Sequence, residues 1–279
     1  MNRAFSILLL AAATLPLASC AVAPGPVLSR GADLAALQAA VAGPVRSEAN
    51  RARDPYRHPA ETLAFFGIRP TDTVVEVWPG GGWYTEILAP YLAAGGGRLI
   101  AAAPTWGRSG LDKLKAANAA TYGPVTYADF PVFDGKAAEI PAGSVDAVLT
   151  FRNVHNWRMG YRRDDKADYS AAAFSQMFAM LKPGGVLGIV DHRLPEGASA
   201  ERERNSGYIK ASTVKALAAA AGFRLAAESD INANPQDTAD WPEGVWTLPP
   251  SFALKDKDRA KYAAIGESDR MTLKFVKPL

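Results

Sequence analysis

Histidines and carboxylates stand at the ends of three apolar runs in this chain. Asn153 and His155 follow one run, His192 stands at the end of a second, and Glu76 ends a third. An imidazole titrates near neutral pH, so His155 or His192 can take a proton from a hydroxyl or amine nucleophile. The pattern predicts acid–base chemistry, with Asn153, His155 and His192 as candidate catalytic residues.

The same residues also admit a structural interpretation. His155 can be an ordinary hydrogen-bonded loop histidine, and Asp191-His192-Arg193 can be a salt-linked strand end. His155, Asp191 and His192 are of metal-ligand type, but they lack the sequence spacing typical of a metal site, so we predict no metal. The single cysteine, Cys20, excludes both a disulfide within the chain and a cysteine-based metal centre.

A glycine-rich turn between a predicted strand and a predicted helix is the most informative feature of the sequence. Residues 71–77 form an apolar run typical of a buried strand, and residues 83–94 repeat apolar side chains with helical periodicity. Gly80-Gly81-Gly82 lies between them. Such a unit opens many nucleotide-binding α/β sheets, where the glycines let a ligand approach the N-terminus of the helix.

The remaining sequence alternates between further strands and helices. The predicted strands are residues 95–104, 125–133, 144–151, 186–193, 223–230 and 271–278. The predicted helices are residues 32–43, 58–66, 109–123, 166–182 and 213–221, the last of them capped by Ser212. This alternation predicts one α/β domain over residues 32–279, with a Rossmann-like, doubly wound, mostly parallel sheet of about seven strands.

Four motifs, in order, resemble those of class I S-adenosylmethionine-dependent methyltransferases over residues 71–275. Residues 76–82 resemble the glycine motif E/D-x-G-x-G-x-G, and residues 134–150 resemble the segment D-A…LP…GSFDxV. Residues 151–157 follow the fourth strand, where the family places substrate and methionine contacts. Residues 181–185 match the Leu-Lys-Pro-Gly-Gly turn before the fifth strand.

The resemblance implies S-adenosyl-L-methionine as cofactor and methyl transfer to a small-molecule or envelope-associated acceptor. Residues 53–68 and 267–278 are also similar to a group of exported members of the family. In the family, the acid matching Glu76 approaches the cofactor's ammonium group, and the acid matching Asp134 meets the adenine amino group. The implied cofactor-binding residues are Glu76, Trp78, Gly80, Gly82, Asp134 and Asn153.

Two positions depart from the family pattern. Trp78 replaces the first glycine of the motif, and Ala103 replaces an acid that binds the ribose. Loss of a charge-assisted hydrogen bond costs about 1.5–3 kcal/mol, or roughly tenfold to a hundredfold in affinity. Trp78 can stack on a ligand or fill the cofactor's space.

These departures leave two alternative functions open. One is an inactive or repurposed methyltransferase-like lipoprotein that binds another ligand or an envelope partner. The other is hydrolysis or isomerisation through His155 and His192, because a fold does not fix its chemistry.

The first 31 residues predict export and a lipid anchor. Residues 1–19 combine a positive start with a short apolar segment and end before Cys20, a pattern that resembles the bacterial lipoprotein lipobox. We expect a lipoprotein signal peptide, an acylated Cys20 and a Pro/Gly-rich tether over residues 20–31. Ala21 resembles the outer-membrane sorting pattern, which predicts an envelope protein that faces the periplasm. The alternative is an ordinary cleaved signal peptide and an incidental cysteine.

Two further segments each have two possible roles. The composition also bears on the kinds of partner that we expect. Arg57-His58 could form a lid or pack against the domain, and residues 241–250, with two tryptophans, could line a substrate site or cover the sheet edge. The net charge is +3, and no run of Lys and Arg is interleaved with aromatic residues, so we expect no nucleic-acid partner. Nothing in the sequence indicates an oligomeric state.

Overall fold

The computed structural model describes residues 33–133, 136 and 138–279. The predicted signal peptide, Cys20, the tether and Asp134 lie outside the described residues.

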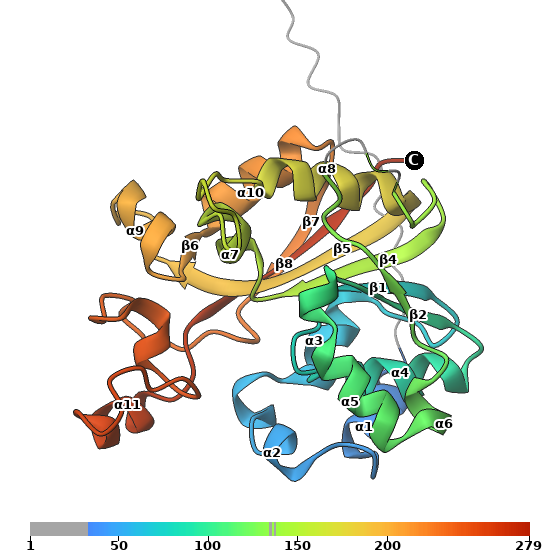
Figure 1. Ribbon diagram of the computed structural model, residues 1–279, viewed down its shortest axis with the longest axis horizontal. Coiled ribbons are helices and arrows are strands. Elements are labelled where there is room, and N and C mark those ends of the chain that lie inside the picture. Colours follow the sequence, from blue (N-terminus) through green and yellow to red (C-terminus); the bar gives the residue numbers. More distant parts are fainter. Residues whose placement is uncertain (1–32, 134–135, 137) are drawn as a thin grey trace, which may run out of the picture.

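One sheet runs through the described part of the chain (Figure 1), in the order β3-β2-β1-β4-β5-β8-β7, with β6 paired to β5 off this path. The strands are β1 (Thr73–Val77), β2 (Arg98–Ala102), β3 (Thr126–Ala128), β4 (Val145–Phe151), β5 (Leu181–Leu194), β6 (Ile209–Lys210), β7 (Arg224–Ser229) and β8 (Arg270–Val276). Neighbours from β3 to β5 are parallel, and β8 runs antiparallel to both β5 and β7. The predicted mostly parallel α/β sheet is confirmed.

Helices cover both faces of this sheet. The α-helices are α1 (Leu34–Ala42), α2 (Glu48–Arg51), α3 (Pro59–Phe66), α4 (Thr85–Ala94), α5 (Ser109–Ala117), α6 (Ala119–Tyr122), α7 (Val154–Arg158), α8 (Ser170–Met180), α9 (Ala200–Asn205), α10 (Ala211–Ala220) and α11 (Arg259–Ile265). Short 3-10 turns are η1 (Asp54–Tyr56), η2 (Thr105–Gly107) and η3 (Gly244–Thr247). α8 and α10 lie on one face, and α1, α3, α4, α5 and α6 lie on the other (Figure 1).

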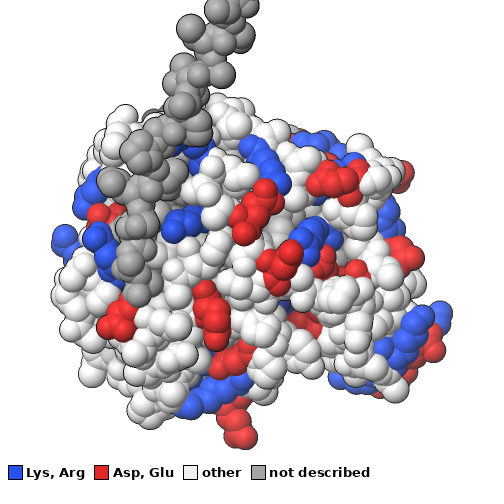
Figure 2. All heavy atoms as spheres, turned by 180° about the vertical axis from the view of Figure 1, so that it is seen from behind, with Lys and Arg blue, Asp and Glu red and all other residues white. Residues whose placement is uncertain are grey.

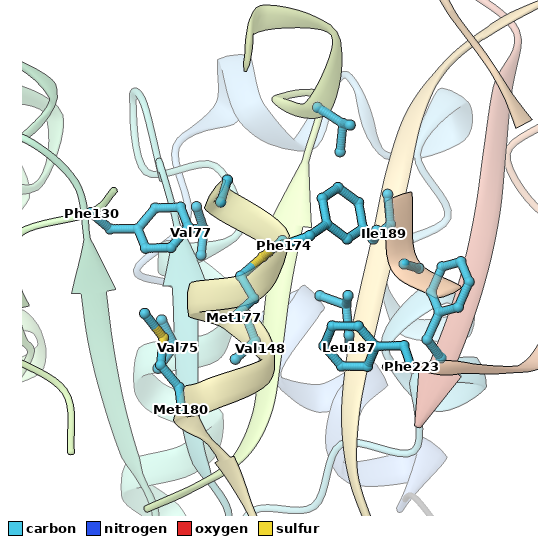
Figure 3. Packing of buried hydrophobic residues seen from close by; sticks show 14 of the residues in the cluster. Val75, Val77, Phe130, Val148, Phe174, Met177, Met180, Leu187, Ile189 and Phe223 are labelled. Carbon is cyan, nitrogen blue, oxygen red and sulfur yellow. The ribbon is translucent and has the colours of Figure 1, made fainter. Parts of the chain in front are cut away.

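Alternate side chains of the central strands enter two different cores. Val75 and Val77 of β1 share a core with Phe174 and Met177 of α8 (Figure 3), whereas Val74 belongs to the core on the opposite face. Successive side chains of a strand point to opposite faces, so a sheet covered on both faces needs nearly continuous apolar strands. This requirement explains the unbroken apolar runs of the sequence.

Several element boundaries differ from the prediction. The helix predicted over residues 109–123 is divided at Asn118, whose side chain accepts a hydrogen bond from Thr121 N and caps α6. Ser212 does not cap α10, because the helix begins at Ala211 and the Ser212 side chain bonds Glu196 instead. The Leu-Lys-Pro-Gly-Gly segment belongs to an irregular start of β5, with a register shift opposite β4.

The surface of the described residues carries both signs of charge. Figure 2 shows Lys and Arg interspersed with Asp and Glu on the face turned away from the view of Figure 1. Within the described ranges, no helix is long and apolar enough to cross a membrane.

Candidate functional site

A cavity of about 320 Å³ lies at the carboxyl ends of β1, β4 and β5. The sheet supplies Glu76 from β1 and His192 from β5. The end of β4 and the start of α7, with the two residues between them, supply Phe151, Arg152, Asn153, His155 and Asn156. The segment around η1 and the segment around η3 complete the wall, with Arg53 and Arg57 from the first and Trp246 from the second. The predicted catalytic residues therefore meet in one cavity.

His155 is held by a carboxylate from the neighbouring strand. Its Nδ1 lies 2.7 Å from Asp191 Oδ1, and its backbone N–H donates to Asp191 Oδ2 at 3.2 Å. Asp191 is fully buried and also accepts a hydrogen bond from the backbone of His192. An ionised carboxylate can only accept, so the shared proton belongs to Nδ1 of His155, and Nε2 is the ring nitrogen left to act as a base. The sequence predicted His155 but missed Asp191 as its partner.

His192 lies beside this pair but has a different environment. Its ring centre is 5.1 Å from that of His155, and its Nδ1 lies 2.5 Å from Ser268 Oγ. Burial, with the nearby His155 and Arg270, lowers the pKa of His192 well below its usual value. His192 is therefore neutral at physiological pH and is a weaker base than an unperturbed histidine.

The same three side chains form a compact group of metal-ligand type. The ligand atoms of His155, Asp191 and His192 all lie within 4.8 Å of one another. Their separation along the sequence hides this proximity, which arises because β4 and β5 are neighbours. The Asp191 carboxylate and both Nδ1 atoms already form hydrogen bonds within the protein. The absence of a metal stays a prediction.

Glu76 is a buried acid at the end of β1. It is 2 % exposed, lines the cavity, and accepts a hydrogen bond from Thr85 Oγ1 at 2.6 Å through Oε2. Burial raises the pKa of Glu76 to about 7, and the hydrogen bond from Thr85 offsets only part of this effect. A cation in the cavity would favour the ionised carboxylate.

The glycine turn leaves space on the side of the cavity. A Cβ atom at Gly80 or Gly81 would meet no atom within 4 Å, and both residues line the cavity. Gly82 has a different place, because a Cβ there would lie 2.4 Å from the side chain of Leu114, and Gly82 is absent from the cavity wall. Gly81, which was not among the predicted site residues, lines the cavity, and the predicted contact of Gly82 with the cofactor stays a prediction.

Asn153 connects the ends of β1 and β4. Its Nδ2 donates to Val77 O at 3.0 Å and lies 3.2 Å from Thr150 Oγ1. These bonds explain its burial, and they make the positioning of the strand ends its visible role. Asn153 also lines the cavity, so its predicted contact with a ligand stays a prediction.

Trp78 forms the wall between this cavity and a second one of about 540 Å³. Its backbone has φ 51°, the left-handed conformation that favours the glycine of the family motif. The indole Nε1 donates to Phe130 O at 2.9 Å, and the ring makes edge contacts with Trp106 and Trp157. The second cavity is otherwise lined mainly by prolines, aromatic rings and charged residues of the loops after β2, β3 and α7.

Comparisons with known proteins agree on the fold. No family model and no curated protein matches this chain. A Galdieria sulphuraria protein named for sarcosine dimethylglycine methyltransferase activity superposes with a TM-score of 0.55 at 13% identity, over 82% of this chain and 85% of its own. Phosphoethanolamine N-methyltransferase 2 of Haemonchus contortus, solved with S-adenosyl-L-methionine, has a TM-score of 0.51 at 17% identity, over 80% and 53% of the two chains. The chain has the class I methyltransferase fold.

A third solved structure with this fold carries a different activity in its name. The [4+2]-cyclase SpnF superposes with a TM-score of 0.54 at 14% identity, over 88% of this chain and 93% of its own. The class I methyltransferase fold by itself therefore leaves the reaction open, and the reaction must be argued from the site.

Two segments around the main cavity had more than one possible role in the sequence. Arg57 lines the main cavity while His58 does not, so only the first residue of the pair belongs to the site. The segment at residues 245–251 supplies Val245, Trp246 and Ser251 to the cavity wall, whereas Trp241 packs on Tyr262 outside it. The sequence left both a substrate wall and a cover of the sheet edge open for this segment, and part of it lines the cavity.

Proposed function

We propose that this protein is an S-adenosylmethionine-dependent methyltransferase that acts on a small-molecule or envelope-associated acceptor. The observation that carries the proposal is the convergence, in one cavity, of a buried Glu76, an open glycine turn and the His155–Asp191 pair. The class I methyltransferase fold supports it, because these groups stand at the carboxyl edge of the sheet, where α/β folds bind ligands.

The residues present fit the cofactor at both of its ends. Glu76 is a buried acid whose charge lacks a cationic partner among its hydrogen bonds, which suits an ammonium group. Gly80 and Gly81 leave room for a ligand against the start of the α4 region. The aromatic walls of the second cavity, with Trp78 and Trp106, suit a flat heterocyclic ring. Asp134, expected to meet the adenine, lies outside the described residues.

When bound, the cofactor supplies a methyl group on a positively charged sulfur, and its carbon–sulfur electron pair leaves with that sulfur. The protein must align the acceptor and accept the proton that the acceptor loses. His155 Nε2 accepts that proton, and Asp191 fixes the ring and stabilises the imidazolium that forms. Asn153 keeps the ends of β1 and β4 together, which holds Glu76 and His155 on the same cavity.

Calorimetric titration with S-adenosylhomocysteine and S-adenosylmethionine tests the proposal on the purified full-length chain. Gly80→Arg should abolish binding, because the new side chain fills the cavity without meeting other atoms at its Cβ. Gly96→Arg is a matched control: its φ of 79° is similarly left-handed, its Cβ also meets nothing, and it lies before β2 at the other end of the sheet. Absence of binding by the unaltered chain up to roughly millimolar ligand would exclude the function.

A repurposed methyltransferase-like protein is the second candidate, and Trp78 favours it. Its indole fills the space between the two cavities and is fixed by the bond to Phe130 O. Ala103, at the end of β2, is buried and offers no carboxylate for a ribose. Such a protein would bind a different ligand in the main cavity and would gain affinity for S-adenosylhomocysteine only when Trp78 is removed.

We also propose that the protein is anchored to the bacterial outer membrane through Cys20 and faces the periplasm. The support is the Leu-Ala-Ser-Cys sequence at the end of an apolar leader, with Ala21 following the cysteine. Growth with radiolabelled palmitate should label the unaltered protein and leave Cys20→Ala unlabelled. Label on both, or on neither, would remove the anchor from the proposal.

A further inference from the structure

Four arginines gather on one side of the main cavity. Arg53 and Arg57 come from the segment around η1, Arg152 follows β4, and Arg270 begins β8. All four line the cavity together with Glu76, His155 and His192. Such a concentration of guanidinium groups in a confined space needs negative charge to balance it.

Glu267 supplies a carboxylate to three of them. Arg53 Nε donates to its Oε1 at 2.5 Å, Arg57 Nε donates to its Oε2 at 3.0 Å, and Arg270 Nη2 donates to Oε2 as well. This shared ion pair fixes the segment around η1 to the segment before β8. It explains why these arginines are present, but one carboxylate cannot balance three cations.

Donors of this cluster remain unsatisfied. Arg57 is 4 % exposed and Arg270 is 2 % exposed, yet Arg57 Nη2 and Arg270 Nε have no hydrogen-bond partner within the described residues. Buried charged donors are rarely left unpaired in proteins. The cluster thus retains hydrogen-bonding capacity beyond the internal ion pair.

Arg152 is near enough to Glu267 for its pKa to be raised by that carboxylate, but the two side chains form no hydrogen bond or salt bridge. Its guanidinium forms no hydrogen bond or ion pair with other described residues, although it lines the cavity and is only partly exposed. Its backbone has φ 64°, a conformation that residues other than glycine rarely adopt. Arg152 stands three positions before His155, so the same turn after β4 brings a cation and the proposed base to one cavity.

The electrostatics of the cavity agree with this geometry. Burial, together with Arg152 and Arg270, lowers the pKa of Arg57 to about 8, even though Glu267 acts in the opposite direction. Burial and Arg270 likewise lower the pKa of Arg152 to about 10, although Glu267 and Asp191 act in the opposite direction. Two other acids are close by, but Asp191 is engaged by His155, and burial raises the pKa of Glu76 to about 7. The cavity therefore has an excess of positive charge.

We propose that the main cavity binds a small molecule through its carboxylate or phosphate group, held by Arg57, Arg152 and Arg270, and that this molecule is the methyl acceptor. The oxyanion site stands on the arginine cluster alone. Its assignment to the acceptor rests on the proposed function. An acceptor fixed in this way presents its hydroxyl or amine to His155 in the same cavity. An acceptor with a cationic or uncharged anchor would leave the cluster unbalanced.

Benzoate, benzamide and inorganic phosphate are suitable probes, because the first two share a shape and differ in charge. Calorimetric titration of the full-length chain, without S-adenosylmethionine, should give heat with benzoate or phosphate and none with benzamide. Arg152→Gln should weaken this binding by roughly tenfold or more, and Arg152→Lys should recover part of it. Arg98→Gln is the matched control, since Arg98 is exposed at the start of β2 and removes the same charge.

Each outcome decides part of the assignment. Equal binding of benzoate and benzamide, or equal losses in Arg152→Gln and Arg98→Gln, would overturn the oxyanion site. Thermal unfolding of both variants shows whether a loss comes from misfolding, and Arg152→Lys guards against that explanation. Displacement of benzoate by S-adenosylhomocysteine would assign the cluster to the cofactor carboxylate and overturn the acceptor. If both ligands bind together, the acceptor assignment holds. Anion binding without any S-adenosylhomocysteine binding would keep the site and refute the proposed methyl transfer.

Discussion

The cavity on one side of Trp78 combines arginines, histidines and a buried acid with aromatic rings, whereas the cavity on the other side is lined by aromatic rings, prolines and charged side chains without a histidine. The polar groups of the first cavity are fixed by bonds between strand ends and helices, such as Thr85 of α4 to Glu76 of β1 and His155 of α7 to Asp191 of β5. The aromatic walls of the second cavity come from the loops that follow β2, β3 and α7.

This difference suits the two cavities to different roles, chemistry in the first and binding of a flat ring in the second. Chemistry needs groups held in a fixed geometry, and strand ends supply that rigidity. Binding of a flat ring needs mainly apolar surface, which loops can provide. Trp78 lines both cavities, so this one side chain lies between the region proposed for the chemistry and the region proposed to bind the flat ring.

The polar cavity is tested most strongly at its base. His155→Gln should reduce kcat for methyl transfer by roughly a hundredfold to ten-thousandfold, since a positioned general base contributes about that much. Asp191→Asn should reduce kcat too, because an amide no longer fixes the imidazole in the required tautomer. Affinity for S-adenosylhomocysteine should stay near that of the unaltered chain in both variants, which separates lost chemistry from lost binding. An unchanged kcat in His155→Gln would show that His155 is not the general base.

Substitution of Glu76 tests whether the polar cavity binds a cation. Its pKa is about 7 when folded and 4.5 as a free side chain, so the folded state keeps a proton that the unfolded state loses between these values. This contribution to stability is present below about pH 4.5 and is lost as the pH rises through 7, by about 3 kcal/mol at most. Glu76→Gln lacks this loss, so its stability relative to the unaltered chain should rise between about pH 5 and about pH 8.

Urea unfolding at several pH values measures this difference, with Glu61→Gln on the exposed surface of α3 as the control for a lost charge. Binding of S-adenosylhomocysteine should strengthen over the same pH range, because its ammonium group favours ionised Glu76. A difference between Glu76→Gln and the unaltered chain that is independent of pH would show that Glu76 is ionised throughout.

The sheet and part of the polar cavity could be predicted because their signals are local. Apolar runs identified β1, β4 and β5, and a side chain near the end of such a run lies at the carboxyl edge. Glu76 and His155 were found in this way. The pairing of His155 with Asp191 joins residues 36 positions apart and depends on β4 and β5 being neighbours, which no local pattern shows.

The arginine side of the cavity could not be predicted for the same reason. Arg57 reaches the site through an ion pair with Glu267, 210 positions away in the sequence. The sequence singled out Gly82 and not Gly81, because the motif does not show that Leu114 of α5 fills the space beside Gly82. In both cases the position of the residue relative to the cavity depends on contacts between elements that are distant in the sequence.

Trp78 tests the boundary between the two cavities. If its indole stacks on the adenine ring, Trp78→Gly should weaken binding of S-adenosylhomocysteine by roughly fivefold to a hundredfold, because stacking on an aromatic side chain is worth about 1–3 kcal/mol per base. Glycine suits the left-handed backbone there, so the variant isolates the side chain. Trp106→Ala removes a ring from the second cavity alone and should have a smaller effect. Binding that appears only in Trp78→Gly would establish the repurposed protein instead.

Ala103 gives the smallest expected effect and tests the chain just after β2, next to Pro104 of the second cavity. Ala103→Asp restores the acid that the family uses for the ribose and should tighten binding of S-adenosylhomocysteine by roughly tenfold, through one charge-assisted hydrogen bond. Ala103 is 1 % exposed, so burial of the new carboxylate opposes part of this gain. Ala103→Asn, of similar size and without charge, separates the two effects. An unchanged affinity in a folded Ala103→Asp protein would mean that the ribose does not lie at the end of β2. The cofactor would then have to extend from one cavity to the other by a different path around Trp78.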